Sequence, residues 1–265
     1  LVATSAFAGA LDVTGAAKIT YVSQDETEVT GNPYSMSQGI GFSGSGELDN
    51  GMTINYGYTM SDAAFSSSTL KLDMGDMGTL SYSDGAGSTG ISAYDDKMPT
   101  AGEEVWDDMD GQANGVATIS NKGTLGYAGT FAGLGVSISY NPDDAVAPAT
   151  TSESSKSIVI SGDVGGASVF LGMGDKAGAS TNTGTDLTTA GLTYASGAVT
   201  VGFQRTSMDL AAANSDVDRN HIAASFAVNE NLSVSYGMST VEFESPSKVD
   251  QEDTGIAVSY TMGSM

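Results

Sequence analysis

The residues with the most chemical potential are carboxylates that gather between residues 84 and 121. They are Asp84, Asp95, Asp96, Glu103, Glu104, Asp107, Asp108 and Asp110, against a single cation, Lys97, before Lys122. Adjacent carboxylates bind hard cations through oxygen, so Asp107, Asp108 and Asp110 form a candidate calcium site, although no EF-hand or nonapeptide spacing is present. Clustered acids can also attract mobile cations, or simply keep a loop solvated. The sequence leaves these three roles open.

Enzymatic chemistry has few candidate residues. The chain has no cysteine and one histidine, His221, which excludes thiol chemistry, disulfides and Cys/His zinc sites. A Ser-His-Asp hydrolase would have to use His221, whereas a lone histidine in a strand more commonly lines a pore or its rim. We therefore expect a protein that is not an enzyme and that needs no cofactor apart from the candidate structural calcium ion.

Composition narrows the class of protein further. The 265 residues include 9 Lys and Arg against 32 Asp and Glu, which gives a net charge of -23. This charge excludes a nucleic-acid partner, because phosphate binding needs a cationic face. No apolar run approaches the ~18 residues that a spanning helix requires. A helical membrane protein is thereby excluded, but a membrane β-barrel is not.

Apolar and polar residues alternate along most of the chain, which predicts strands with one apolar and one polar face. Met52, Ile54 and Tyr56, for example, alternate with Thr53 and Asn55. We count fourteen such segments. Helical periodicity is almost absent, and the sequence therefore indicates an all-β protein.

The connections alternate between tight turns and longer polar loops. Turns rich in Gly, Asn or Asp are centred on Asp49, Asp76, Gly133, Gly165, Ser196, Asn229 and Gly263. The longer loops cover residues 24–35, 141–156, 175–186, 206–218 and 240–253. One hairpin per roughly thirty residues, with tyrosines at the ends of several apolar faces, is typical of an outer-membrane barrel rather than of a soluble sandwich. We therefore predict a transmembrane, antiparallel, up-and-down β-barrel.

In such a barrel, alternation also predicts which charges face the interior. The inward-facing set is Lys18, Lys71, Asp73, Lys122, Arg219 and His221. Arg205 lies at one of the alternate positions of its strand whose side chains would face lipid. We expect Arg205 to lie above the membrane edge, because an arginine at mid-bilayer would cost about 2–4 kcal/mol.

The segment 84–121 interrupts the regular hairpin period. Thr100 and Glu103 form a capping box after Pro99, which predicts a short helix from near Ala101 through Asp107. Trp106 would lie in this helix, where it could stack on a sugar ring or wedge the helix against the wall. A long loop in a regular barrel is usually functional.

The first residues suggest export. Ala6, Phe7 and Ala8 match the small-residue pattern before a signal-peptidase cut. We interpret residues 1–8 as the remainder of a signal peptide and residues 9–265 as the barrel domain. An uninformative N-terminal tail is the alternative.

Together these features resemble the general porins of Gram-negative outer membranes, most like the alphaproteobacterial type. The resemblance rests on the leader followed by residues 11–21, the alternating turns and loops, and the enlarged third loop. It implies a homotrimer of sixteen-stranded barrels in outer-membrane lipid, with the third loop folded into the lumen. The pore constriction would then carry Asp95, Asp96, Glu103, Glu104, Asp107 and Asp108.

The chain departs from this family pattern in two ways. Fourteen strands are readable instead of sixteen, and the sequence stops at Met265 without a terminal aromatic strand. We interpret the last hairpin as missing from the sequence, with a closed fourteen-stranded barrel as the alternative. The arginine cluster that usually faces the acidic loop in such porins is also sparse here.

The resemblance and the charges imply a passive channel for small hydrophilic solutes and ions. Loop acids opposite wall bases would create a transverse field, and the excess of acids predicts a preference for cations. Salt would weaken this preference, because charges are screened over ~10 Å at 0.1 M. Two other functions stay open, namely an exported β-rich adhesin or surface-lattice protein with calcium-binding acidic loops, and, more distantly, a membrane-embedded hydrolase.

Overall fold

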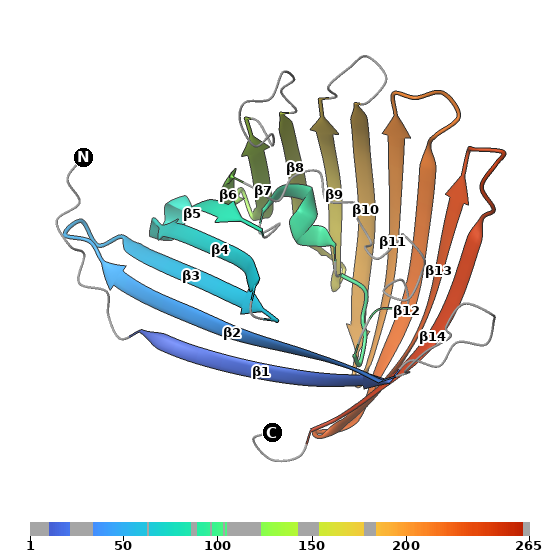
Figure 1. Ribbon diagram of the computed structural model, residues 1–265, viewed down its shortest axis with the longest axis horizontal. Helices are drawn as coiled ribbons and strands as arrows, with labels where there is room; N and C mark the ends of the chain where they lie inside the picture. Colours follow the sequence, from blue (N-terminus) through green and yellow to red (C-terminus); the bar gives the residue numbers. More distant parts are fainter. Residues whose placement is uncertain are drawn as a thin grey trace. The chain divides into compact units, whose positions relative to one another are not determined.

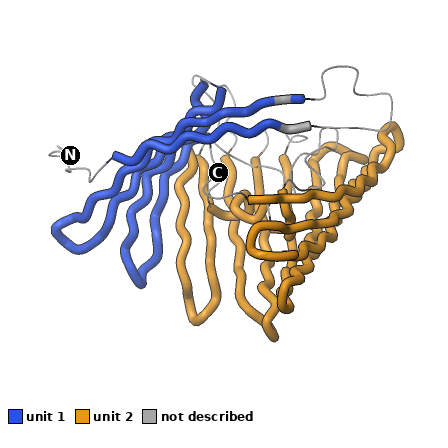
Figure 2. The backbone as a smooth tube through the Cα atoms, turned by 90° about the horizontal axis from the view of Figure 1, so that it is seen from below, with its two compact units in different colours: residues 1–86 blue, residues 87–265 orange. Residues whose placement is uncertain are grey.

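The chain folds into antiparallel strands that form two compact units. The computed structural model describes residues 11–21, 34–62, 64–85, 89–95, 97–102, 104, 123–142, 154–177 and 184–261. Residues 1–86 make up unit 1 and residues 87–265 make up unit 2 (Figure 2). The predicted signal-peptide remainder, residues 1–8, lies outside the described residues.

Unit 1 contains five strands, each paired antiparallel with its neighbour in the chain. They are β1 (Asp12–Tyr21), β2 (Tyr34–Glu47), β3 (Thr53–Ser61), β4 (Ala64–Asp73) and β5 (Thr79–Asp84), with the short 3-10 helix η1 (Gly75–Met77) between the last two.

Unit 2 contains nine strands, which lie side by side in chain order (Figure 1). They are β6 (Thr124–Phe131), β7 (Leu134–Asn141), β8 (Ser155–Val164), β9 (Ala167–Lys176), β10 (Thr185–Ser196), β11 (Val199–Leu210), β12 (Val217–Asn229), β13 (Leu232–Phe243) and β14 (Gln251–Tyr260). A 3-10 helix, η2 (Gly90–Tyr94), precedes them. The described residues thus form fourteen up-and-down strands, which confirms the predicted fold class.

Burial in unit 2 is the inverse of that in a soluble protein. Along β8, Ile158 and Ile160 are exposed, while Ser155 and Ser157 are buried. We call the face that carries Ile158, Phe203 and Ile222 the outer face, and the face that carries Ser157, Gln204 and His221 the inner face. Large exposed apolar surfaces mark contact with lipid or protein. Because the apolar side chains are not enclosed between two sheets, the sandwich alternative is wrong.

The tight turns within the described residues occur where the sequence predicts them, whereas the turn predicted at Gly263 lies outside those residues. Gly165 and Gly166 adopt φ angles of 61° and 85° between β8 and β9, a region that side chains with a Cβ rarely enter. At the β12–β13 turn, the Asn229 side-chain oxygen accepts hydrogen bonds from the backbone N–H groups of Asn231 and Leu232, at 2.9 and 3.0 Å.

The strands extend further into the loops than predicted. β11 runs to Leu210 and β12 begins at Val217, so only 211–216 remain of the predicted loop 206–218. The apolar–polar pattern is lost here because polar residues such as Asp209 occupy the outer face. The backbone hydrogen bonds between the strands continue although the pattern does not. Asp216 closes the connection by accepting a hydrogen bond from the Leu210 N–H at 2.8 Å.

The helix predicted from Ala101 is wrong for the described residues of that stretch, because Ala101, Gly102 and Glu104 are not helical. The Thr100 hydroxyl instead accepts a hydrogen bond from the Gly102 N–H at 3.1 Å, which forms a local turn. Among the described residues of this loop, the helical turn is η2, which begins eleven residues before Ala101. Among the described residues, no helix is both long and apolar enough to cross a membrane.

Candidate functional site

The candidate site is built where the long loop meets the inner face of unit 2. We call its described residues 89–95 and 97–102 the docked segment. Its helix η2 contacts β7, β8 and β9 (Figure 1). The segment therefore covers the polar side of the sheet and leaves the apolar outer face open.

Wall hydroxyls satisfy the beginning of η2. The first N–H groups of a helix lack partners within the helix, and η2 has no side-chain cap of its own. The Gly90 N–H donates to the Ser137 Oγ at 2.8 Å, and the Ile91 N–H donates to the Ser157 Oγ at 2.9 Å. Ser157 is in turn hydrogen-bonded to Ser139 at 2.6 Å. Serines that alternation places on the inner face thus act as the helix cap.

Further hydrogen bonds hold the rest of the docked segment. The Gln204 side-chain amide on β11 donates to the Tyr94 carbonyl oxygen at 3.0 Å. The Ala101 N–H donates to the Ser235 Oγ on β13 at 2.8 Å. The Tyr94 hydroxyl donates to the Ser161 Oγ on β8 at 3.0 Å. These contacts join residues more than sixty positions apart in the chain, so the segment is fixed at both of its ends.

Two apolar side chains anchor the segment between these hydrogen bonds. Ile91 is fully buried, and Met98 is 5% exposed. The wall residues around Ile91 are Val159, Phe170 and Leu187, and those around Met98 are Val217, Ala223 and Val241. All six occupy the otherwise polar inner face. At these positions an apolar residue departs from the alternation of its strand, and they mark where the segment docks.

One predicted loop acid meets one predicted wall base. Asp95, which directly follows η2, is half-buried and interacts electrostatically with Arg219 of β12. Arg219 and His221 are on the inner face, as alternation predicts, and are 6% and 1% exposed. The His221 Nδ1 is hydrogen-bonded to the Ser239 Oγ at 2.7 Å. Both side chains are thus enclosed in the wall rather than open to solvent.

The remaining predicted site residues lie in unit 1, in an irregular stretch of the loop, or outside the described residues. Lys18, Lys71 and Asp73 are on strands β1 and β4 of unit 1, where Asp73 accepts a hydrogen bond from the Gly75 N–H at 2.9 Å. Glu104 is half-buried and lies outside any helix or strand. Outside the described residues lie Asp96, Glu103, Trp106, Asp107, Asp108, Asp110 and Lys122. Within the described ranges, no group of three candidate metal ligands occurs.

Arg205 is on the outer face, as its parity predicts. Its guanidinium group contacts Asp218 at 3.1 Å and Asn220 at 3.2 Å, both on the same face of β12. The charge therefore lies within a small polar group on the outer face of β11 and β12.

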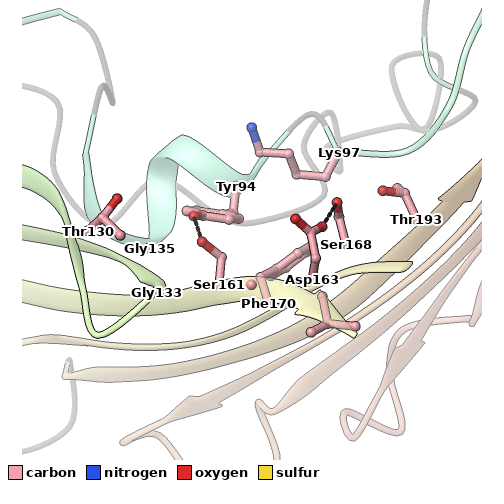
Figure 3. A pocket seen from close by; sticks show the side chains of 12 residues that line it. Tyr94, Lys97, Thr130, Gly133, Gly135, Ser161, Asp163, Ser168, Phe170 and Thr193 are labelled. Carbon is pink, nitrogen blue, oxygen red and sulfur yellow. Dashed lines mark hydrogen bonds between the residues drawn. The ribbon is translucent and has the colours of Figure 1, made fainter. Parts of the chain in front are cut away.

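A recess of about 400 Å³ opens beside the docked segment, over the turn-proximal half of β6–β10 (Figure 3). Its charged lining residues are Lys97 from the segment and Asp163 from β8, and Tyr94 forms part of its wall. Lys97, Asp163 and Tyr94 are not among the predicted site residues. Alternation does place Asp163 on the same face as Ser157 and Ser161, so its position on the inner face was predictable from the sequence.

The comparison with known proteins decides the family. A sequence profile described as Gram-negative porin matches residues 1–265. The chain belongs to the Gram-negative porins. No curated protein matches the sequence.

Solved structures show the same fold at low sequence identity. An anion-selective porin from Comamonas acidovorans is 16% identical, with a TM-score of 0.66 over 96% of this chain and 86% of that chain. OmpT, an outer membrane protein of Vibrio cholerae, is 12% identical, with a TM-score of 0.63 over 96% and 83%. Salmonella typhi OmpF is 12% identical, with a TM-score of 0.58 over 88% and 79%. This porin is therefore a β-barrel channel protein of the Gram-negative outer membrane.

Proposed function

We propose that this porin is a passive diffusion channel for small hydrophilic solutes and ions, that it prefers cations, and that it works without enzymatic chemistry. The observation that carries the proposal is the inversion of burial in unit 2. Its apolar side chains are exposed on the outer face, whereas serine and glutamine side chains hold the docked segment on the inner face. That arrangement suits lipid on one side and water on the other.

Cation preference would come from the excess of acids over bases in the chain. Asp95 interacts with Arg219, so it contributes little net charge. The preference must then depend on the other predicted constriction acids, Asp96, Glu103, Glu104, Asp107 and Asp108, and on the net charge of -23. The fold alone does not decide whether a porin prefers cations or anions, since an anion-selective porin has the same fold.

Reversal potentials across a planar bilayer with a KCl gradient test this proposal. The wild type should conduct in discrete steps and favour potassium over chloride, less so at high salt. Replacing Glu103 and Glu104 by Gln and Asp107 and Asp108 by Asn should lower that ratio. Unchanged reversal potentials would contradict the constriction assignment.

The matched control removes four carboxylates from the outer face. These changes are Asp186→Asn, Asp209→Asn, Glu242→Gln and Glu252→Gln, at exposed positions on β10, β11, β13 and β14. These changes alter the net charge by the same amount as the constriction variant, but they lie away from the inner face. The control should keep the potassium preference of the wild type.

Several further properties belong to the same proposal. His221 and its partner Ser239 are both buried, and this supports a channel rather than a hydrolase, because a substrate could not reach them. We also propose a homotrimer in outer-membrane lipid, which light scattering of the detergent-solubilised protein would test. The adhesin or lattice alternative instead requires a protein that is soluble without detergent.

Calcium at Asp107, Asp108 and Asp110 stays a prediction, for which calcium-dependent thermal stability is the measurement.

A further inference from the structure

We propose that the recess between the docked segment and the wall is a binding site for small zwitterions, that is, solutes that carry both an ammonium and a carboxylate group, such as free amino acids. This inference rests on the proposed channel function and names a class of solute for it. Its basis is a pair of opposite charges, Lys97 and Asp163, that line one recess (Figure 3).

The two charges are each held in place but do not neutralise each other. The exposed Lys97 ammonium lies 5.1 Å from the centroid of the Tyr94 ring, a cation–π contact that leaves its N–H donors available. Asp163 accepts a hydrogen bond from the Ser168 hydroxyl at 2.7 Å. Ion pairs such as Lys156 with Asp175 and Arg205 with Asp218 involve other residues, on the outer face. A cation and an anion therefore face the same water-filled space.

The polarity of this recess is the reverse of that expected for the constriction. Here the base is on the loop and the acid is on the wall, whereas the sequence predicts acids on the loop and bases on the wall. A monovalent cation would be attracted by Asp163 but repelled by Lys97, and an anion would meet the opposite pair of forces. A zwitterion can satisfy both charges at once, with its carboxylate toward Lys97 and its ammonium toward Asp163.

The loop side of the recess is rigid, which favours binding by limiting the entropy lost. The Tyr94 hydroxyl is bound to Ser161, its carbonyl oxygen is bound to Gln204, and its ring packs against Phe170 with centroids 4.9 Å apart. Tyr94 in turn supports Lys97. Uncharged polar lining comes from Thr130 and Thr193. A volume of about 400 Å³ is within the range of small-molecule sites.

The test measures binding to the refolded full chain in detergent micelles by saturation-transfer NMR. The probes are glycine, 4-aminobutyrate and 6-aminohexanoate, which vary the distance between the two charges. Butylammonium and butyrate each carry one of the two charges of 4-aminobutyrate. At least one of the three zwitterions should bind about tenfold or more tightly than either singly charged probe. Equal affinities would overturn the proposal without any variant being needed.

Variants then locate the site. Lys97→Gln and Asp163→Asn should each reduce zwitterion affinity to that of the singly charged probes. The exchange Lys97→Asp with Asp163→Lys should keep much of the affinity, because a zwitterion can bind in the reverse direction. Lys156→Gln and Asp175→Asn make the same charge changes on the outer face and should have no effect. Wild-type affinity in both single variants would overturn the assignment.

Conductance of the same preparations in KCl distinguishes the two proposals. Stepwise conductance without preferential zwitterion binding would leave the channel function standing and reject this site. Zwitterion binding without conductance would support the site and reject the channel function.

Discussion

Replacing Ile91 by Ala should loosen the docked segment while the wall stays intact. Ile91 is fully buried among Val159, Phe170 and Leu187. The surrounding strands are held by continuous hydrogen-bond ladders, so the wall has little freedom to close the cavity. The N–H bonds from η2 to Ser157 and Ser137 remain in the variant, and the loss is therefore one of packing.

The expected cost of this change is about 2–5 kcal/mol, the usual range for truncating a buried isoleucine to alanine. If the loss falls on docking alone, the ratio of docked to undocked segment decreases roughly 30- to 5,000-fold. Single-channel recording should then show larger current fluctuations than in the wild type, because the segment leaves the wall more often.

Leu171→Ala is the matched control, since it removes the same number of carbon atoms from the neighbouring strand. Leu171 is 67% exposed on the outer face and contacts lipid in this account. Its replacement should leave the current fluctuations unchanged. If the current fluctuations of Ile91→Ala were no larger than those of the wild type, the reasoning that Ile91 anchors the segment would be refuted.

Three other substitutions test neighbouring contacts. A Cβ at Gly202 would lie 2.5 Å from the Pro99 Cδ, so Gly202→Ala should displace the segment and alter unit conductance, whereas Gly44→Ala, with no atom within 4 Å, should not. Ser157→Ala leaves the buried Ile91 N–H without its acceptor, which should cost about 1–3 kcal/mol and lower the thermal unfolding temperature more than Ser196→Ala at an exposed turn. Arg205→Ala removes an exposed ion pair with Asp218, which is worth about 0–1 kcal/mol, so a large drop in unfolding temperature would contradict our description of that contact.

The strands of this porin were predictable because alternation records which face meets lipid. The outward direction of Arg205 and the inward direction of Arg219 and His221 follow from the same rule. The ends of strands were less predictable. Ser66, Ser67 and Ser68 belong to β4, but a polar run has no alternation to reveal it.

The docking of the long loop was predictable only in outline. A serine on the inner face looks the same in sequence whether it contacts water or caps η2, as Ser137 does. The capping-box pattern at Thr100 indicated a helix, but the Ala101 N–H bonds to Ser235 of the distant β13 instead. Apolar residues on the polar face, such as Val159 beside Ile158 and Ile160, were the available signal for the docking positions.

The most direct measurement of the central claim is the aqueous reactivity of two adjacent residues on β10. The chain has no cysteine, so Leu192→Cys and Thr193→Cys each introduce a unique thiol. In proteoliposomes, a charged, water-soluble thiol reagent should modify the cysteine at position 193, on the inner face, and change the conductance. The cysteine at position 192, on the outer face, should stay unmodified in lipid. Equal modification of both positions, or modification at 192 alone, would contradict the account.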